Sequence, residues 1–123
     1  TVTDNNTKLV WAKCSDGLTG TTCTGGGLNS PILSTALTTC NNYTLAGKTW
    51  RLPNANELRS LLDYSLTTST IINSTFPNTN ATQYWTSSTN PNNTSFGFLH
   101  YFNTGGFAAL VKGNARPFRC VAN

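Results

Sequence analysis

Four cysteines are the residues of this sequence with the most definite chemistry: Cys14, Cys23, Cys40 and Cys120. None of them forms the Cys-x-x-Cys pair that zinc sites commonly use, so we expect no metal site. An even number of cysteines in a small chain rich in Asn and Thr favours disulfides and an oxidising compartment. The segment from Cys14 to Cys23 is rich in Gly and Thr, and we expect these two cysteines to close it as a local bridge.

The remaining reactive side chains do not suggest catalysis. The only histidine, His100, lies in the aromatic stretch FGFLHYF, and the four acids are scattered along the chain as Asp4, Asp16, Glu57 and Asp63. No Ser-His-Asp or Cys-His arrangement can be assembled from them, and cysteines held in disulfides are not nucleophiles. We therefore expect a protein that is not an enzyme and uses no cofactor, with His100 as a packed or surface residue.

The charge balance limits the choice of partner. Eight Lys and Arg residues stand against four acids, which gives a formal net charge of +4. This excess can favour anionic partners such as sulfated glycans, although a domain with few acids also becomes basic without any such role. The excess is too small and the compartment is wrong for a nucleic-acid partner. No apolar run approaches the length of a membrane span, and we expect a mature or excised domain of a larger protein that is extracellular or anchored at a surface.

Two helices are predicted within a single domain that covers residues 1–123. The first helix begins near Asn29 or Ser30, followed by Pro31, and its apolar positions share one face. These positions are Ile32, Leu33, Ala36, Leu37 and Cys40. The second helix has Asn54 as its N-cap and Glu57 three residues later, which is a capping-box pattern. Its apolar stripe is Leu58, Leu61 and Leu62, and we expect it to end near Tyr64 and Ser65.

Short strands occupy the rest of the chain. Asp4-Asn5-Asn6 predicts a turn between two β-prone pieces of residues 1–13, and Asn103 to Gly106 predicts another turn. The later strands are expected at four places: residues 84–87, 96–102, 107–112 and 118–121. Two helices followed by antiparallel strands indicate an α+β domain.

Four segments carry a resemblance to a known family: TVTDNNTKLVWAKC, WRLPNANELRSLLDYS, FPNTNATQYWTSST and FRCV, in this order. Together they resemble the Lcl C-terminal domain family of bacterial surface proteins, in a member similar to those of spirochaetes. The resemblance implies a C-type-lectin-like fold, in which a cysteine of the first helix bonds one in the last strand. Cys40 would then pair with Cys120 and leave Cys14 with Cys23. From the residues alone, the other pairings stay open.

The resemblance also implies a role. It suggests an adhesin-like binding module at the cell surface, with a host glycan, sulfated or unsulfated, or a host protein as its partner. Sugar-binding C-type lectins use Ca²⁺, but Asn90-Pro91-Asn92 contains no acid to hold that ion. Two alternatives remain: a trimerising head domain of a surface protein, or a ligand-binding protein diversified by a retroelement. Trp50, Leu52, Leu58 and Trp85 are expected in the core, and Arg51 in a local ion pair.

The candidate ligand-binding residues lie in the C-terminal part of the chain, which combines aromatic anchors with amides and cations. They are Asn92, Tyr101, Phe107, Lys112, Arg116 and Arg119. Alternation in FRCV places Arg119 on the face opposite Cys120, so that Lys112, Arg116 and Arg119 can converge on a sulfate. In FGFLHYF one parity must face the core and the other can form a contact surface. Phe107, beside two glycines, is the best single candidate for an exposed aromatic residue.

Overall fold

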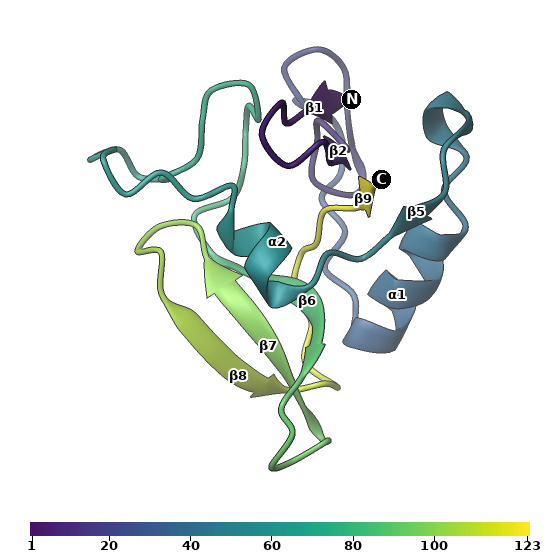
Figure 1. Ribbon diagram of the computed structural model, residues 1–123, viewed down its shortest axis with the longest axis vertical. Coiled ribbons are helices and arrows are strands. Elements are labelled where there is room, and N and C mark those ends of the chain that lie inside the picture. Colours follow the sequence, from purple (N-terminus) through teal and green to yellow (C-terminus); the bar gives the residue numbers. More distant parts are fainter.

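Both chain ends enter one four-stranded antiparallel sheet. The computed structural model describes residues 1–123, and Figure 1 shows the two termini close together. The strands are β1 (Val2–Thr3), β2 (Val10–Trp11), β9 (Val121–Ala122) and β5 (Trp50–Arg51), in the order β1-β2-β9-β5. The predicted hairpin in residues 1–13 is confirmed, because β1 pairs with β2 and the Asp4 carboxylate accepts a hydrogen bond from the Asn6 N–H.

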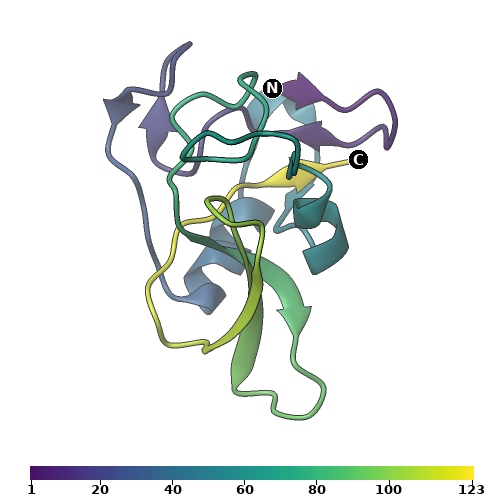
Figure 2. The same ribbon diagram turned by 90° about the vertical axis from the view of Figure 1, so that its left-hand side faces the viewer.

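A second antiparallel sheet carries the later strands. It consists of β6 (Gln83–Thr89), β7 (Phe96–Tyr101) and β8 (Phe107–Val111), in the order β6-β7-β8. Figure 2 shows the β6–β7 hairpin projecting at the end of the molecule remote from the termini. These three strands were predicted, whereas the short pair β3 (Leu18–Thr19) and β4 (Gly25–Gly26) inside the first disulfide loop was not.

The last predicted strand is shorter than expected. β9 begins at Val121 rather than at Phe118. The preceding residues bond instead to the irregular segment after β2: Asp16 N–H donates to Phe118 O and Ala12 N–H donates to Cys120 O, both at 3.0 Å. Phe118, Arg119 and Cys120 are all buried, so the alternation that we expected for a strand does not apply there.

The two helices are placed correctly but with different limits. α1 (Leu33–Asn41) starts after Ile32, so neither Asn29 nor Ser30 is its N-cap. The face that it buries consists of Leu33, Ala36 and Cys40, while Ile32 is exposed and Leu37 is partly buried. A short 3-10 helix, η1 (Leu45–Gly47), follows it.

α2 (Ala55–Arg59) has the predicted capping box. Glu57 N–H donates to Asn54 Oδ1 at 2.8 Å, and Asn54 N–H donates to Glu57 Oε1 at 2.9 Å. The helix ends at Arg59 and not near Tyr64, because the chain then turns and Leu62 forms a bridge with Ile72. The predicted ion pair of Arg51 is confirmed: its guanidinium donates two hydrogen bonds to the Glu57 carboxylate, at 2.6 and 2.7 Å.

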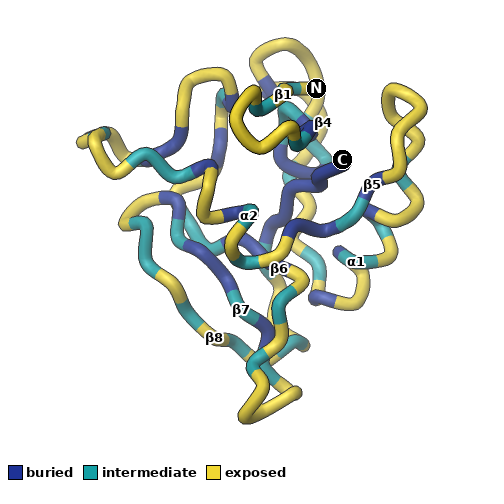
Figure 3. The backbone as a smooth tube through the Cα atoms, viewed as in Figure 1, coloured by how far each residue is buried: buried dark blue, intermediate teal, exposed yellow.

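Two apolar clusters fill the space between these elements, as the dark segments of Figure 3 indicate. Trp50, Leu52 and Trp85 belong to one cluster and Leu58 to the other, so all four predicted core residues are buried. Three tryptophans buried to 1% exposure or less supply much of the apolar area that stabilises a chain of this length.

Both expected disulfides are present. Cys14 bonds Cys23, and Cys40 on α1 bonds Cys120 immediately before β9. The fold is α+β, with two helices, small antiparallel sheets and two disulfides. The closer relation to C-type lectins stays a prediction.

Replacing Cys40 and Cys120 together by Ala should lower the free energy of unfolding by about 4.5 kcal/mol, because the bridge spans a sequence separation of 80. Replacing Cys14 and Cys23, with a separation of 9, should cost about 2.7 kcal/mol. Urea unfolding of the two double variants makes the comparison. An equal or greater loss for the short loop would contradict this ranking.

Candidate binding surface

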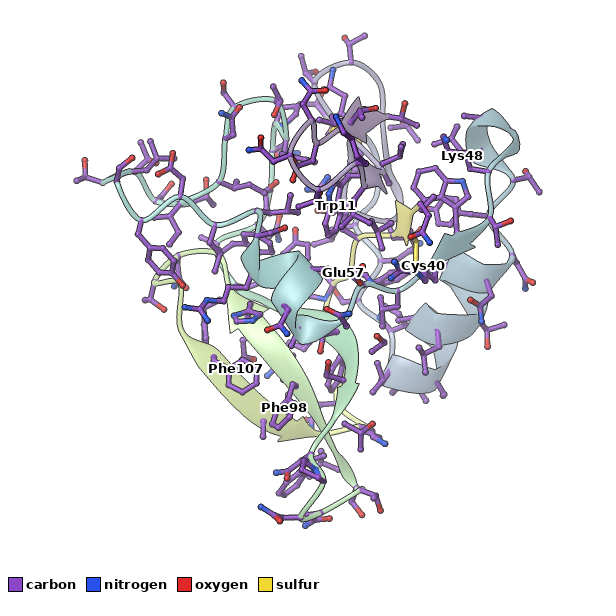
Figure 4. The ribbon with its side chains drawn as sticks, viewed as in Figure 1. Trp11, Cys40, Lys48, Glu57, Phe98 and Phe107 are labelled. Atoms are coloured by element: carbon purple, nitrogen blue, oxygen red, sulfur yellow. A yellow bond between two sulfur atoms is a disulfide. The ribbon has the colours of Figure 1, made fainter.

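One face of the second sheet exposes aromatic side chains. Residues paired directly across antiparallel strands point to the same side, and the register pairs Phe96 with Val111, Phe98 with Ala109 and His100 with Phe107. We call this side the aromatic face; its members are Phe96, Phe98, His100, Phe107, Ala109 and Val111. The Phe107 ring lies 4.6 Å from that of Phe98 and 5.0 Å from that of His100, measured between centroids. Figure 4 shows Phe98 and Phe107 next to each other on the side of the sheet where α2 lies.

The opposite face of the same sheet belongs to the core. Leu99 is fully buried there, and Gly97 lies so close to its neighbours that an added Cβ would be 2.9 Å from Leu33 and 3.0 Å from Trp85. Gly97 therefore leaves room for the side chains of Leu33 on α1 and Trp85 on β6 to pack against the start of β7. This packing decides which parity of FGFLHYF faces outward, a choice that the sequence left open.

Phe107 is the most prominent member of the aromatic face. Its side chain is 53% exposed, so the prediction of an exposed aromatic residue is confirmed. It borders a hollow of about 380 Å³ between α2, the following turn and the start of β8. The hollow is lined by Ala55, Asn56, Arg59, Tyr64, His100, Gly105 and Phe107.

Two aromatic side chains flank this hollow. Tyr64 is 61% exposed, and its hydroxyl donates to Gly105 O at 3.1 Å. Gly105 has a φ of 74°, and a Cβ there would lie 2.4 Å from the Tyr64 ring, so only glycine allows both this turn and this contact. Tyr64 and Phe107 are thereby held on two sides of the hollow.

Two polar side chains in the hollow have no partner within the chain. The side chains of Asn56 and Arg59 make no hydrogen bond or ion pair with protein groups, and none of the lining residues is an acid. Both project from α2, which is fixed by its capping box and by a 2.9 Å bond from Ala55 N–H to Ser88 Oγ on β6. The hollow thus offers a guanidinium and an amide beside two aromatic rings.

His100 forms the buried side of the hollow. It is 4% exposed, and its Nδ1 atom is buried without a hydrogen-bond partner. Burial lowers the pKa of His100 below its ordinary value, and the positive charge of Arg59 lowers it further, although the backbone of Gly106 and Ala55 favours the charged form. The imidazole is therefore neutral at neutral pH, and it acts as an apolar support for Phe107.

The other predicted ligand residues do not join Phe107. Tyr101 and Arg116 lie on the opposite face of the sheet, where Arg116 Nε donates to Gln83 Oε1 at 2.6 Å and Gln83 Nε2 donates to the Tyr101 hydroxyl. Lys112 has the same strand parity as these residues, one position beyond β8. Asn92 is exposed in the β6–β7 turn, which an Asn90 side chain stabilises by accepting from Asn92 N–H at 3.0 Å.

The buried position of Arg119 contradicts the prediction of a sulfate-binding cluster. Its side chain is fully buried, and its guanidinium donates to Ala12 O at 2.9 Å, to Lys13 O and to Thr79 Oγ1 at 2.8 Å. The Phe76 ring lies 4.9 Å from its Cζ atom. Arg119 therefore cannot contact a ligand at the surface, and Lys112, Arg116 and Arg119 do not converge. The prediction failed because it assumed a regular strand across FRCV.

The sequence-based candidates did not include Asn56, Arg59 and Tyr64. Asn56 and Arg59 are three positions apart on the polar side of the predicted helix, a spacing that could have placed them together. Tyr64 gave no such signal, because its position depends on the early end of α2 and on contact with Gly105.

A larger hollow of about 790 Å³ lies against residues 63–81. Its lining is mostly hydroxyl and amide groups, and the one aromatic residue, Phe76, is buried beneath Arg119. It lacks the exposed rings and the free cation of the smaller hollow, which is therefore the better candidate.

The structure is that of a small α+β domain with two disulfides and one partly exposed aromatic face. The family model of the Lcl C-terminal domain matches residues 1–122, and the chain belongs to this family. No curated protein matches the chain. The family comprises domains of surface or secreted proteins, in agreement with the two disulfides. None of the helices has the length and apolar character needed to cross a bilayer.

Replacing Arg119 by Met should lower the free energy of unfolding by about 3 kcal/mol or more, because buried carbonyl and hydroxyl groups lose a charged donor. Replacing Arg116 by Met, which is partly exposed, should cost less than about 1.5 kcal/mol. Urea unfolding of both variants provides the test. Similar losses would show that Arg119 contributes no more than an ordinary hydrogen-bonded side chain.

The neutral state of His100 predicts a pH dependence of stability. Its folded pKa is lowered, so the unfolded chain binds the proton more readily and unfolding becomes easier as the pH falls below about 6.5. The stabilisation is complete above that pH. Urea midpoints at pH 7.5 and about 5.5 should differ in the native chain and not in His100→Phe. This range lies above the titration of Asp and Glu. A midpoint that does not change in the native chain would contradict the prediction.

Proposed function

We propose that this domain is a non-catalytic binding module, and that it holds a host glycan through the aromatic face and the hollow beside it. The observation that carries the proposal is Phe107, a half-exposed ring at the border of a hollow with unpaired donors. An aromatic ring in this position gains little for folding, and it offers a flat apolar surface to a partner.

The polar groups favour a sugar over a purely apolar ligand. Asn56 and Arg59 present several N–H donors, and Asn56 also presents a carbonyl acceptor. Pockets that bind small ligands combine apolar walls with a few polar groups that fix orientation, and this hollow has both. A sugar ring can lie against Phe107 or Tyr64 while its hydroxyl groups bond to the side chains of α2. A protein partner would use the same aromatic anchors, and it is the alternative occupant.

The charge of the hollow extends the proposal to acidic sugars. Arg59 has no carboxylate partner, and no acid lines the hollow. A guanidinium in this state can form charge-assisted hydrogen bonds with a carboxylate or a sulfate. An anionic glycan would therefore be held by Arg59, and not by the predicted set of Lys112, Arg116 and Arg119.

Replacing Phe107 by Ala should weaken binding of the glycan selected from an array about 30-fold, as for other central interface residues. The change should lower the free energy of unfolding by no more than about 1.5 kcal/mol, because only its contacts with Phe98 and His100 are lost. Titration calorimetry and thermal unfolding measure the two effects.

Leu45→Ala is the matched control for this experiment. Leu45 is 47% exposed on η1, which Figure 1 places after α1 and away from the second sheet. This variant should bind like the native chain. Unchanged binding by Phe107→Ala would overturn the proposed site, and an array without any bound glycan would overturn the choice of ligand.

A further inference from the structure

The two edges of the second sheet differ. β6 is covered along its outer side, where Trp85 N–H donates to Pro117 O at 3.0 Å and Ser87 N–H donates to Pro53 O at 2.8 Å. β8 is the other edge, and its only strand partner is β7. The hydrogen bonds at both ends of this pair, from Tyr101 N–H and from Lys112 N–H, fix which residues of β8 face β7.

Alternate residues of β8 turn their backbone away from β7. Gly106 O accepts from Tyr101 N–H, and Lys112 N–H donates to Ser95 O. Hydrogen-bonded positions alternate along an antiparallel pair, so the backbone groups of Ala108 and Leu110 also face β7. The backbone groups of Phe107, Ala109 and Val111 face outward. The backbone N–H groups of these three residues donate to no other part of the chain. The C=O of Val111 is already occupied, because Asn114 donates to it through both its backbone N–H and its Nδ2 group, each at 3.0 Å. The outward C=O groups of Phe107 and Ala109 accept from no other part of the chain.

This open edge lacks the usual protection. Natural proteins protect exposed edge strands with charges, proline, bulges or covering segments. β8 reads FAALV, pairs with β7 in an unbroken register and exposes Phe107 to 53% and Val111 to 47%. Figure 3 shows it at the outside of the sheet, with exposed and partly buried residues in alternation. A strand with these properties is suited to pairing with another strand.

We propose that β8 pairs antiparallel with β8 of a second copy of this chain, with Ala109 at the two-fold axis. In that register each outward-facing residue meets another outward-facing residue: Ala109 meets itself, and Phe107 meets Val111 of the partner subunit. Large side chains lie opposite medium ones, two small residues lie at the centre, and no like charges are brought together within the strand. The contact is self-complementary, as a two-fold interface requires.

The pairing joins two three-stranded sheets into one of six strands. The aromatic faces of the two copies then form one continuous surface, and the hollow beside each Phe107 stays open. The contact is short, below the roughly 1,200 Å² of stable interfaces, so we expect a weak dimer that forms at high protein concentration. It is a dimer and not the trimer considered as an alternative. This proposal does not depend on the proposed ligand.

A charge exchange at the two-fold axis tests the register. In Ala109→Lys two like charges face each other, and the same is true of Ala109→Glu. Each variant alone should stay monomeric in sedimentation at concentrations up to about 1 mM, where the native chain dimerises. An equal mixture of the two variants should form a heterodimer. Circular dichroism confirms that each variant is folded.

Two results would overturn the proposal: a native chain that stays monomeric or forms trimers, or variants whose association is unchanged and whose mixture shows no gain. Amide exchange adds an independent measurement. Protection of the Ala109 and Val111 amides should rise with protein concentration, while the amides of Ala108 and Leu110 are protected throughout. Protection of Ala109 and Val111 that does not depend on concentration also contradicts edge pairing.

Discussion

A buried cation organises the centre of this domain. Arg119 has no carboxylate partner, and its buried Nε has no hydrogen-bond partner. Its two terminal nitrogens donate to oxygens of four residues: Ala12, Lys13, Ser15 and Thr79. These oxygens come from the segment after β2 and from the loop before β6, so one side chain links distant parts of the sequence. Burial lowers its pKa to about 10, mainly through desolvation, yet it stays protonated at neutral pH. If these acceptors moved away, the buried charge would be left unpaired at a large cost in free energy, so Arg119 fixes the positions of its acceptors.

The neighbouring residue extends the same link covalently. Cys120 bonds Cys40, so that adjacent residues of the last segment hold α1 on one side and the loops on the other. Because β9 follows immediately and pairs with both β2 and β5, the C-terminal strand is fixed by hydrogen bonds, by a disulfide and by Arg119. The second sheet rests on this framework, since Leu99 and Trp85 on its inner face belong to the cluster that contains Cys120. The aromatic face is therefore displayed on a rigid support.

The sequence predicted features that depend on short-range patterns. The capping box of Asn54 and Glu57 fixed the start of α2, and alternation located β6, β7 and β8. Phe107 was recognised because two glycines precede it. The role of Arg119 could not be predicted, since alternation assumes a regular strand and its acceptors lie about 40 and 107 residues away. The hollow was also missed, because it depends on where α2 ends and on how Tyr64 meets Gly105.

The distribution of charge separates the two faces of the second sheet. On the inner side, the guanidinium of Arg116 donates hydrogen bonds to Gln83 Oε1 and to Ala115 O, so its donors are partly engaged within the fold. Arg59 on the outer side has no such partner, and Glu57, the acid nearest to it in sequence, is already paired with Arg51. An acid that is engaged within the fold cannot neutralise the hollow. The ion pair that stabilises the start of α2 therefore also leaves Arg59 free, and in this way a local folding interaction determines the charge that a ligand meets.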